Sequence, residues 1–313
     1  MGRYVIQRLL AAIPVLFIVA IITFSLIHIT PGDPATLMAG DQALPEQIAA
    51  IKAKLGLDKP MYQQLGSYFA DILRGDLGES VFTKFKVTEL IKQRLPPSLF
   101  IAIYSQVFAI LVAIPLGILA AWKANTWIDR VAMIFAVMGL ALPSFWLGFN
   151  LMWLFAVKLS WFPAIGYEPL TEGVIPWIKS LTLPSLTVGM ISAALITRMT
   201  RSTMLEVLRE DYIRTARAKG LREFPVLFRH GFKNASIPVV TIIGLSFAGL
   251  VGGLVVTEAV FAIPGVGRLV VDAVLRRDYA IIQGTTLMVT VAYVMINLIV
   301  DVIYGYLDPR IRY

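Results

Sequence analysis

The sequence predicts an all-α membrane protein with six transmembrane helices, a long extracytoplasmic segment after the first of them and a short cytoplasmic helix between the fourth and fifth. Three observations lead to this fold class. Hydrophobic residues make up 58% of the 313 residues, more than a water-exposed surface tolerates. They gather in runs of about 20 residues or more, the length of helix that crosses a hydrocarbon core. Lysine and arginine gather in every second connection between the runs.

Six apolar runs are the candidates for the transmembrane helices. They cover residues 9–29, 98–122, 131–157, 180–199, 237–260 and 284–307. The fourth run contains Pro184, which a membrane helix tolerates when neighbouring groups satisfy the carbonyl that proline leaves free. We therefore predict that all six runs cross the membrane.

The first run belongs either to a cleaved signal peptide or to an uncleaved anchor. It is longer than the apolar region of a signal peptide, and no small-x-small cleavage site follows it. Instead, Pro31-Gly32 marks a turn. We predict an uncleaved signal anchor, so that residues 1–97 form an anchor helix with an extracytoplasmic segment and residues 98–313 form the main transmembrane domain.

Positive charge sets the predicted orientation. The Lys and Arg residues of the short connections are Arg3, Arg8, Lys123, Arg130, Arg310, Arg312 and nine more between residues 198 and 236. Because short cytoplasmic loops carry an excess of Lys and Arg, both termini are predicted to be cytoplasmic. The net charge of +8 is then explained by topology, and no nucleic-acid partner is predicted.

Two short amphipathic helices are predicted within the extracytoplasmic segment. Ile48 and Ile51 fall on one helical face between Pro45 and Gly56, and a second apolar stripe ends before Gly75. Such helices either lie against the outer membrane surface or pack on the protein itself. The sequence leaves both alternatives open.

Residues 211–220 have the pattern of a short capped helix. Asp211 lies at its start, where the helix dipole favours negative charge, and Arg217 and Lys219 lie near its end. Gly220 is placed to adopt the left-handed conformation that terminates a helix. Small side chains that another protein can approach closely occupy three positions: Thr215, Ala216 and Ala218. Such a helix either docks a partner or only enforces topology, and the pattern alone does not separate the two.

The composition leaves little for catalysis. Cysteine is absent, and His28 and His230 are the two histidines, so disulfides, thiolate sites and histidine-rich metal sites are not expected. The pattern Gly-x-x-x-x-Gly-Lys-Ser/Thr, whose backbone amides hold phosphates, does not occur. We predict no catalytic residue, no metal ligand and no cofactor-binding residue in this chain.

Polar residues and glycines within the runs are candidates for a substrate pathway, because a polar group in lipid is costly. The polar side chains are Asn150, Glu258, Asn297 and Asp301. The two acids lie near run ends, where an interfacial position is expected, and the two asparagines are expected to bond between helices. Glycines of the fifth run permit either close helix packing or a pathway beside them. The candidate pathway-lining residues are Asn150, Gly249, Gly252 and Gly253.

Several short motifs follow one another in a fixed order. They include Tyr4-Val5-Ile6-Gln7-Arg8-Leu9, Pro31-Gly32-Asp33-Pro34, Gly75-Asp76-Leu77-Gly78, Arg229-His230-Gly231-Phe232-Lys233-Asn234, Thr257-Glu258-Ala259-Val260-Phe261, Pro264-Gly265-Val266-Gly267-Arg268 and Leu307-Asp308-Pro309-Arg310. In this order they resemble the first permease subunit of the dipeptide/oligopeptide/nickel ABC importer family, over nearly the whole chain. In the wider class the cytoplasmic loop reads Glu-Ala-Ala, three residues, then glycine, whereas here Arg214-Thr215-Ala216 precedes Gly220.

The resemblance implies a permease subunit of an ATP-driven importer in the bacterial inner membrane. Residues 98–313 would be its transmembrane domain and would form half of a pathway for peptides delivered by an extracytoplasmic binding protein, with glutathione or a nickel complex as the alternative cargo. ATP and magnesium would be bound by two separate ATPase subunits, and a homologous second permease would complete the pathway. The cytoplasmic helix would dock on an ATPase subunit through Asp211, Tyr212, Arg214, Thr215, Ala216, Arg217, Ala218, Lys219 and Gly220.

Two other classes fit the sequence less well. A secondary transporter usually has related halves with buried carboxylates or broken helices, and we find no internal repeat. A membrane enzyme needs a nucleophile or a metal site, for which this composition offers little. A channel is a further alternative, but it would not need the capped basic loop. A stable ATP-hydrolysing partner is required by the importer alone and would separate these classes.

Overall fold

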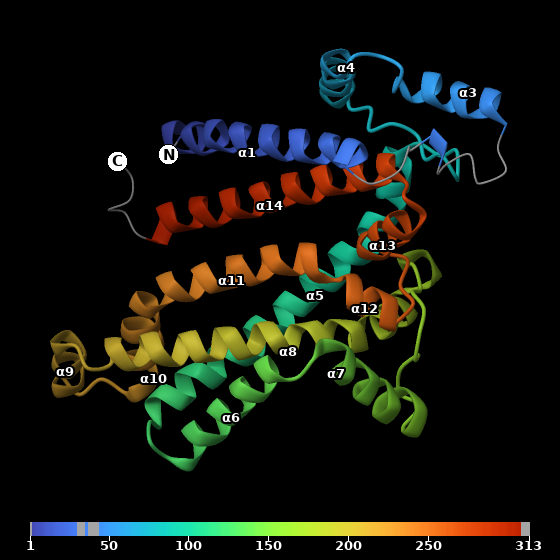
Figure 1. The fold of residues 1–313 in the computed structure, drawn as a ribbon. Coiled ribbons are helices and arrows are strands. Elements are labelled where there is room, and N and C mark those ends of the chain that lie inside the picture. Colours follow the sequence, from blue (N-terminus) through green and yellow to red (C-terminus); the bar gives the residue numbers. More distant parts are fainter. Residues whose placement is uncertain (1, 30–34, 37–43, 308–313) are drawn as a thin grey trace.

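The computed structural model describes residues 2–29, 35–36 and 44–307, and these are largely helical (Figure 1). Within them, one isolated bridge between Glu79 and Lys86 is the extended pairing present. The long helices are α1 (Gly2–Ile29), α5 (Val87–Trp122), α6 (Trp127–Ala141), α8 (Val174–Val207), α11 (Lys233–Gly253) and α14 (Tyr279–Leu307). The shorter ones are α3 (Pro45–Leu55), α4 (Met61–Leu73), α7 (Ser144–Leu151), α9 (Asp211–Ala218), α10 (Glu223–Pro225), α12 (Val255–Val260) and α13 (Val266–Arg276). The predicted all-α class is confirmed.

The third apolar run forms a bent pair of helices. Of the described helices, five are long and apolar enough to cross a membrane, and α6 with α7 adds a sixth crossing if the two count as one, although they meet at 108°. The bend lies at Leu142, whose backbone is extended (φ −81°, ψ 130°), because the ring of Pro143 disfavours a helical conformation in the residue before it. A π-helical turn, Met152–Lys158, continues α7.

The fifth run is also divided. A second π-helical turn, η3 (Val226–Phe232), leads directly into α11, so the helical stretch begins before the predicted start at residue 237. At the other end α11 stops at Gly253, and α12 is a separate short helix. The last part of the predicted run, residues 255–260, therefore belongs to α12 and not to α11.

The central helix is α8, the run with the weakest apolar signal. It packs against α5, α6, α7 and α11, and 78% of its most apolar stretch is buried, compared with 17% for α1. A helix surrounded by other helices needs small and hydroxyl-bearing side chains for close packing more than it needs apolar ones for lipid. Thr182 and Thr187 satisfy their hydroxyls on carbonyls one turn back, at 2.7 and 2.8 Å. The modest hydropathy of this run is therefore a sign of its central position.

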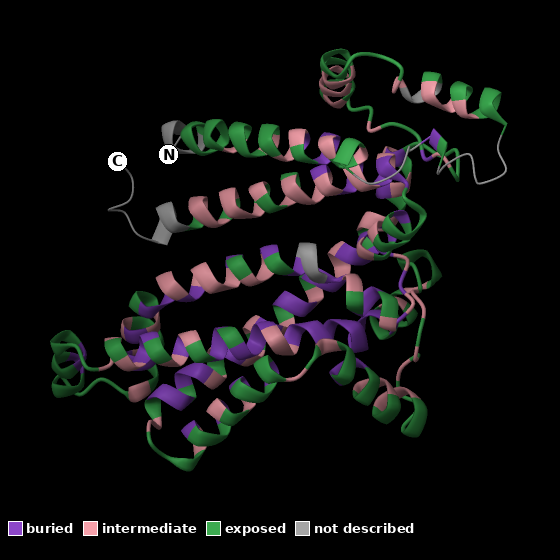
Figure 2. Cartoon of the chain, viewed as in Figure 1, coloured by how far each residue is buried: buried purple, intermediate pink, exposed green. Residues whose placement is uncertain are grey.

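Helices α1 and α14 pack together as an outer pair on the bundle (Figure 1). Arg8 Nε lies 3.1 Å from Asp301 Oδ2, and Gln283 Nε2 donates to the carbonyl of Thr23 at 3.2 Å. Figure 2 shows the exposed surface of α1 in contrast to the buried α8. The exposed side chains of α1 are large and apolar, as expected for a helix that faces lipid.

Both amphipathic helices predicted in the extracytoplasmic segment are present as α3 and α4. Gly56 (φ +66°) terminates α3, and Gly75 (φ +77°) follows α4. Phe69 stacks on Phe17 of α1 with ring centroids 5.0 Å apart. Helix α4 thus contacts α1 of the protein itself, and contact of these helices with the outer membrane surface stays a prediction.

The start of α1, the end of α14 and α9 lie at one end of the bundle, and α3, α4 and α13 lie at the other (Figure 1). We call these the α9 end and the α4 end. The turn predicted at Pro31-Gly32 and the terminal Arg310 and Arg312 lie outside the described residues. Residue 97, where we divided the chain, falls inside α5, and the division itself stays a prediction.

Candidate functional site

Helix α9 has the capped form that its sequence predicts. Asp211 occupies its first turn and Arg217 its last. At its C-terminus Gly220 has φ +76°, the amide of Gly220 donates to Arg217 O at 2.9 Å, and the amide of Leu221 donates to Ala216 O at 3.4 Å. These two bonds around a left-handed glycine form a Schellman motif, which satisfies carbonyls that would otherwise be left free.

One face of α9 is packed on the chain itself. Ile213 is fully buried and Ala216 is 8% exposed, and both lie against Val226 of η3 and Leu208. The expectation that Ala216 belongs to an accessible docking surface is therefore wrong: its side chain points into the protein. The reason is the 3.6-residue period, because residues 213 and 216 share a face and the bulky Ile213 takes that face to the apolar cluster.

Two further predicted docking residues contact the chain itself. The hydroxyl of Tyr212 accepts from Asn234 Nδ2 at 2.7 Å. The guanidinium of Arg217 donates to both carboxylate oxygens of Glu223, at 3.1 and 3.3 Å. These bonds fix α9 against α10 and the start of α11. Apart from Ala216, all of the predicted docking residues are exposed: Asp211, Tyr212, Arg214, Thr215, Arg217, Ala218, Lys219 and Gly220.

The π-helical turn η3, on which α9 packs, also contacts the helices of the bundle. Leu227 of η3 belongs to a buried cluster with Ile118 of α5 and Met204 of α8. At Gly231 an added Cβ would lie 3.2 Å from Met204 Cε and 3.3 Å from the carbonyl of Val226. The base of α9 is thus in packed contact with α5 and α8 through side chains of η3.

A partly buried ion pair joins α6 to α8 near the α9 end. Asp129, 4% exposed, accepts from Arg201 Nη2 at 2.7 Å and from Arg201 Nε, and its Oδ2 also accepts from the amide of Asn125 at 2.9 Å. Sequence reasoning missed this pair because it placed Arg201 in the loop and did not consider Asp129. The available signal was an acid in the first turn of a helix that begins at Trp127.

One candidate pathway residue, Gly249, lines a crevice between α8 and α11. The crevice has a volume of about 370 Å³ and is lined by apolar residues together with Ser192, Ser246 and Gly249. An added Cβ at Gly249 would meet nothing within 4 Å, so this glycine borders open space. By contrast, a Cβ at Gly244 would overlap Val300 Cγ2, and that glycine serves close packing of α11 on α14.

Of the other candidate pathway residues, Asn150 does not line this crevice. Asn150, on α7, donates to the carbonyl of Trp146 at 2.7 Å and is exposed. Gly252 and Gly253 lie in the last turn of α11, and their surroundings are outside the described residues. Asn297 likewise donates to a carbonyl of its own helix, that of Tyr293, at 2.9 Å. The expected bonds between helices are therefore wrong for both asparagines.

Glu258 is fully buried at the α4 end, and the interfacial depth expected for it stays a prediction. Ser98 Oγ of α5 donates to Glu258 Oε1 at 2.6 Å, and the amide of Arg268 donates to Oε2 at 2.9 Å. Ser98 Oγ in turn accepts from the amide of Val266 at 2.9 Å. The carboxylate therefore caps the N-terminus of α13, where unpaired amides and the helix dipole favour an anion. A Cβ at Gly265 would overlap Glu258 Cδ, which explains why this position is glycine.

Among the described residues, no group of three or more His, Asp or Glu side chains gathers as a metal site would require. Three features stand out: helix α9 packed on η3 at one end, the crevice between α8 and α11, and, at the other end, the buried clamp, in which Glu258 and Ser98 cap α13.

Comparisons with known proteins agree with this description. Residues 113–313 match the family "Binding-protein-dependent transport system inner membrane component", and residues 1–102 match its N-terminal companion family. The chain is 44% identical over its full length to a probable peptide ABC transporter permease protein, y4tP, of Sinorhizobium fredii, and the match covers 100% of that protein. It is 42% identical to the dipeptide transport system permease protein DppB of Alkalihalophilus pseudofirmus and 45% identical to the glutathione transport system permease protein GsiC of Salmonella choleraesuis, each over 100% of both chains.

A solved structure has the same fold. A chain of the MetNI methionine ABC transporter in an inward-facing conformation superposes with a TM-score of 0.59, covering 71% of this chain and 97% of that chain at 19% identity. At this identity the likeness concerns the fold alone.

Proposed function

This chain belongs to the family of binding-protein-dependent transport system inner membrane components, and on that premise we propose that it forms half of a translocation pathway for peptides and is coupled to ATP hydrolysis through α9. It is a permease subunit of an ABC importer and a multi-pass inner-membrane protein. The chain would supply helices to the pathway, and the energy for transport would come from partner subunits.

The observation that carries the coupling proposal is the mounting of α9. The helix stands on a buried base of Ile213 and Ala216, while the residues around Thr215 and Ala218 face outward. A short rigid helix with small outward side chains suits insertion into a groove of another protein. The chain has no phosphate-binding loop, so ATP and magnesium would be bound by separate ATPase subunits, and force would enter through this helix.

The inner contacts of α9 supply a route from that surface to the pathway. Its base rests on η3, which continues into α11, and α11 forms one wall of the crevice that contains Ser246 and Gly249. Movement of α9 would therefore change the separation of α8 and α11. We assign the crevice to this chain's half of the pathway.

The complete transporter would contain a second, homologous permease, two ATPase subunits and an extracytoplasmic binding protein. One chain of this size supplies a single helical bundle with a crevice open at its side, and a matching bundle would close it. Transport in proteoliposomes by this chain with ATPase subunits, without a second permease, would contradict this assembly.

The cargo class rests on the relatives. Proteins similar over their full length are named for peptide and dipeptide transport, and GsiC for glutathione, which is itself a tripeptide. Peptides are the proposed cargo, with glutathione as the alternative and a nickel complex after it. Identifying the ligand of the cognate binding protein decides among them.

Coupling is tested by placing a charge on the outward face of α9. Ala218→Glu should abolish docking, because an unpaired charge in a close contact costs several kcal/mol, and transport should fall at least about tenfold. Ala218 is the correct position, since glutamate at Ala216 would break the internal base of α9 instead. Gly220→Pro should act similarly, because proline fixes φ near −65° and cannot replace a residue at +76°.

The matched control is Ala49→Glu, the same substitution on the exposed surface of α3 at the opposite end. All variants should insert into the membrane normally. Normal transport and ATPase association in Ala218→Glu would refute the docking role of α9 and would leave the helix as a topology signal.

The proposed orientation places the α9 end, with both termini, in the cytoplasm. The chain lacks cysteine, so single-cysteine variants report sidedness directly. We choose Asp58→Cys and Lys219→Cys, which are exposed and, unlike the neighbouring Gly56 and Gly220, have no left-handed backbone to strain. An impermeant maleimide should label the first from outside and the second only from inside; the reverse would overturn the topology.

A further inference from the structure

A polar pocket and an apolar groove follow one another between α1, α4 and α14 at the α4 end. The pocket has a volume of about 190 Å³ and the groove about 680 Å³. On α1 the pocket is lined by Phe24 and the groove by Ala20, one turn earlier; on α14 the pocket is lined by Gln283 and the groove by Leu287, one turn later. The two cavities therefore lie one helical turn apart along the contact between α1, α4 and α14.

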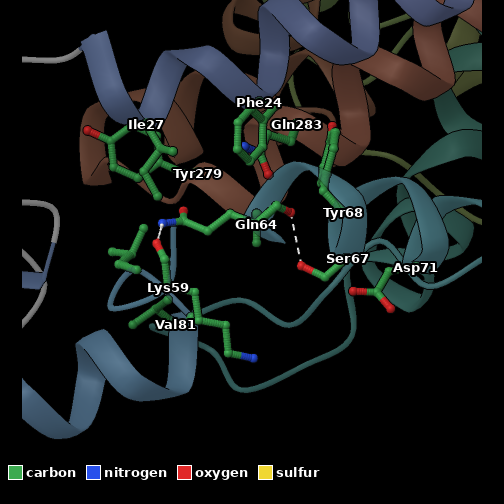
Figure 3. A pocket seen from close by; sticks show the side chains of 13 residues that line it. Phe24, Ile27, Lys59, Gln64, Ser67, Tyr68, Asp71, Val81, Tyr279 and Gln283 are labelled. Atoms are coloured by element: carbon green, nitrogen blue, oxygen red, sulfur yellow. Dashed lines mark hydrogen bonds between the residues drawn. The ribbon is translucent and has the colours of Figure 1, made fainter. Parts of the chain in front are cut away.

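The polar pocket carries one positive and one negative side chain. Figure 3 shows Lys59 and Asp71 on opposite sides of it. Gln64 and Ser67 of α4 line it between them, and each is fixed locally: Gln64 Nε2 donates to Lys59 O at 2.7 Å and Ser67 Oγ to Gln64 O at 2.9 Å. Tyr279 also lines the pocket, and its buried hydroxyl has no partner. This lining is complementary to a zwitterion rather than to an anion.

The groove has no polar lining residue. All of its lining side chains are aliphatic, methionine or phenylalanine. Leu73, which lines the groove, is 87% exposed. The neighbouring helix α1 also has exposed apolar side chains, as a membrane helix does. A groove of this size left empty would forfeit the dispersion energy of its walls, and in a membrane the available filling is hydrocarbon.

We propose that pocket and groove together bind one zwitterionic phospholipid with an ammonium headgroup, of the phosphatidylethanolamine type. The phosphate would lie toward Lys59, the ammonium toward Asp71, and an acyl chain would fill the groove between α1, α4 and α14. A free peptide is also a zwitterion, but it has no part that the adjoining apolar groove would take. A lipid matches both cavities in one molecule, with its headgroup in the polar pocket and its acyl chain in the apolar groove.

The lipid would act as a packing partner of α4. That helix has no buried residue of its own and contacts α1 chiefly through Phe69 on Phe17, Tyr68 near Phe24 at 5.5 Å, and a 3.1 Å hydrogen bond between Tyr68 and Thr23. An acyl chain below α4 would complete the apolar contacts that the protein leaves open. The proposal concerns the anchoring of α4 and does not depend on coupling through α9.

The first test is photocrosslinking of the full-length chain in nanodiscs of mixed phosphatidylethanolamine and phosphatidylglycerol. A trace of phosphatidylethanolamine with a diazirine in its acyl chain should label peptides containing residues 13–20, 69–73 and 287–291 more strongly than the exposed apolar surface of α6 around Val131. Ala20→Phe, which fills the groove, should remove this excess. Equal labelling of both surfaces, or loss of the label on adding excess dipeptide, would overturn the assignment.

The second test uses exposed charges and does not disturb the helix packing. Asp71→Lys makes the pocket positive, so the ratio of phosphatidylethanolamine to phosphatidylglycerol that copurifies with the chain should fall at least about threefold, the scale of an exposed charge contact. Glu172→Lys, the same change at an exposed acid outside the pocket, should leave the ratio as in the wild type. An equal ratio in both variants would refute the headgroup site.

Discussion

Replacement of Glu258 should destabilise the end of the bundle where α5, α12 and α13 meet. Its carboxylate is fully buried and accepts hydrogen bonds from the Ser98 hydroxyl and from the Arg268 amide. Alanine removes the acceptor for both donors. It also leaves a cavity, because the backbone around the Pro264-Gly265 turn is shaped to the carboxylate.

The magnitude follows from the unpaired donors. Each buried donor that loses its partner costs about 1–3 kcal/mol, and entry of water into the new cavity offsets part of this. We expect Glu258→Ala to lower the free energy of unfolding by about 3–5 kcal/mol, near the upper end for single substitutions. Glu258→Gln should lose less, since its carbonyl can accept from the Arg268 amide while its amide donates to Ser98 Oγ. The Ser98 hydroxyl can then turn to the carbonyl of Arg94, 3.4 Å away.

Thermal unfolding of the detergent-solubilised chain measures the effect. At roughly 2 °C per kcal/mol for a chain of this size, the midpoint of Glu258→Ala should fall by about 6–10 °C and that of Glu258→Gln by less. Glu172→Ala, at an exposed acid, serves as the control. A midpoint for Glu258→Ala within about 2 °C of that control would show that the buried clamp contributes little, and the reasoning would fail.

Two other predictions use the same measurement. Gly244→Ala should lower the free energy of unfolding by about 1–3 kcal/mol, because its Cβ would clash with Val300 and force α11 away from α14. Gly249→Ala should be neutral. Partial restoration by Val300→Ala would confirm the contact, and equal effects at both glycines would contradict it. Asp129→Asn leaves the Arg201 guanidinium without its buried carboxylate and should cost about 2–4 kcal/mol. A double-mutant cycle with Arg201→Gln should give a coupling energy of about 1–3 kcal/mol, and a coupling near zero would show that the pair does not hold α6 to α8.

Local signals in the sequence were enough for much of the fold. Apolar runs located the membrane helices, and glycines with φ > 0 ended α3 and α9 where the pattern places them, because a left-handed terminus depends on one residue. The break at Leu142 was also a local signal, the proline after it, but the length of the apolar run concealed it. The 3.6-residue period places Ala216 on the same face of α9 as Ile213, but the sequence does not show that this face is covered, since its cover is Val226, ten residues further on and in another element.

The buried carboxylates show a different limit. Whether an acid near the end of an apolar run meets water or a helix N-terminus depends on a partner that is distant in sequence. For Glu258 that partner is Ser98, 160 residues away, and for Asp129 it is Arg201, 72 residues away. Neither pairing has a periodicity that would reveal it. The partners of these acids could therefore not be identified until the helices were placed in space.

The packing of glycines indicates which part of the bundle is able to move. On the contact between α5 and α8, a Cβ at Gly117 would lie 2.6 Å from Thr200 Cβ, and one at Gly189 would lie 2.8 Å from Phe108 Cδ1. Helices in such close contact cannot slide without a steric clash, so α5 and α8 should behave as one rigid unit. On the side of α11 that faces α8, Gly249 borders open space. Because η3 joins the base of α9 directly to α11, a displacement that enters at α9 is expected to move α11 against the α5–α8 pair, and the crevice between α8 and α11 is where that movement changes the available volume.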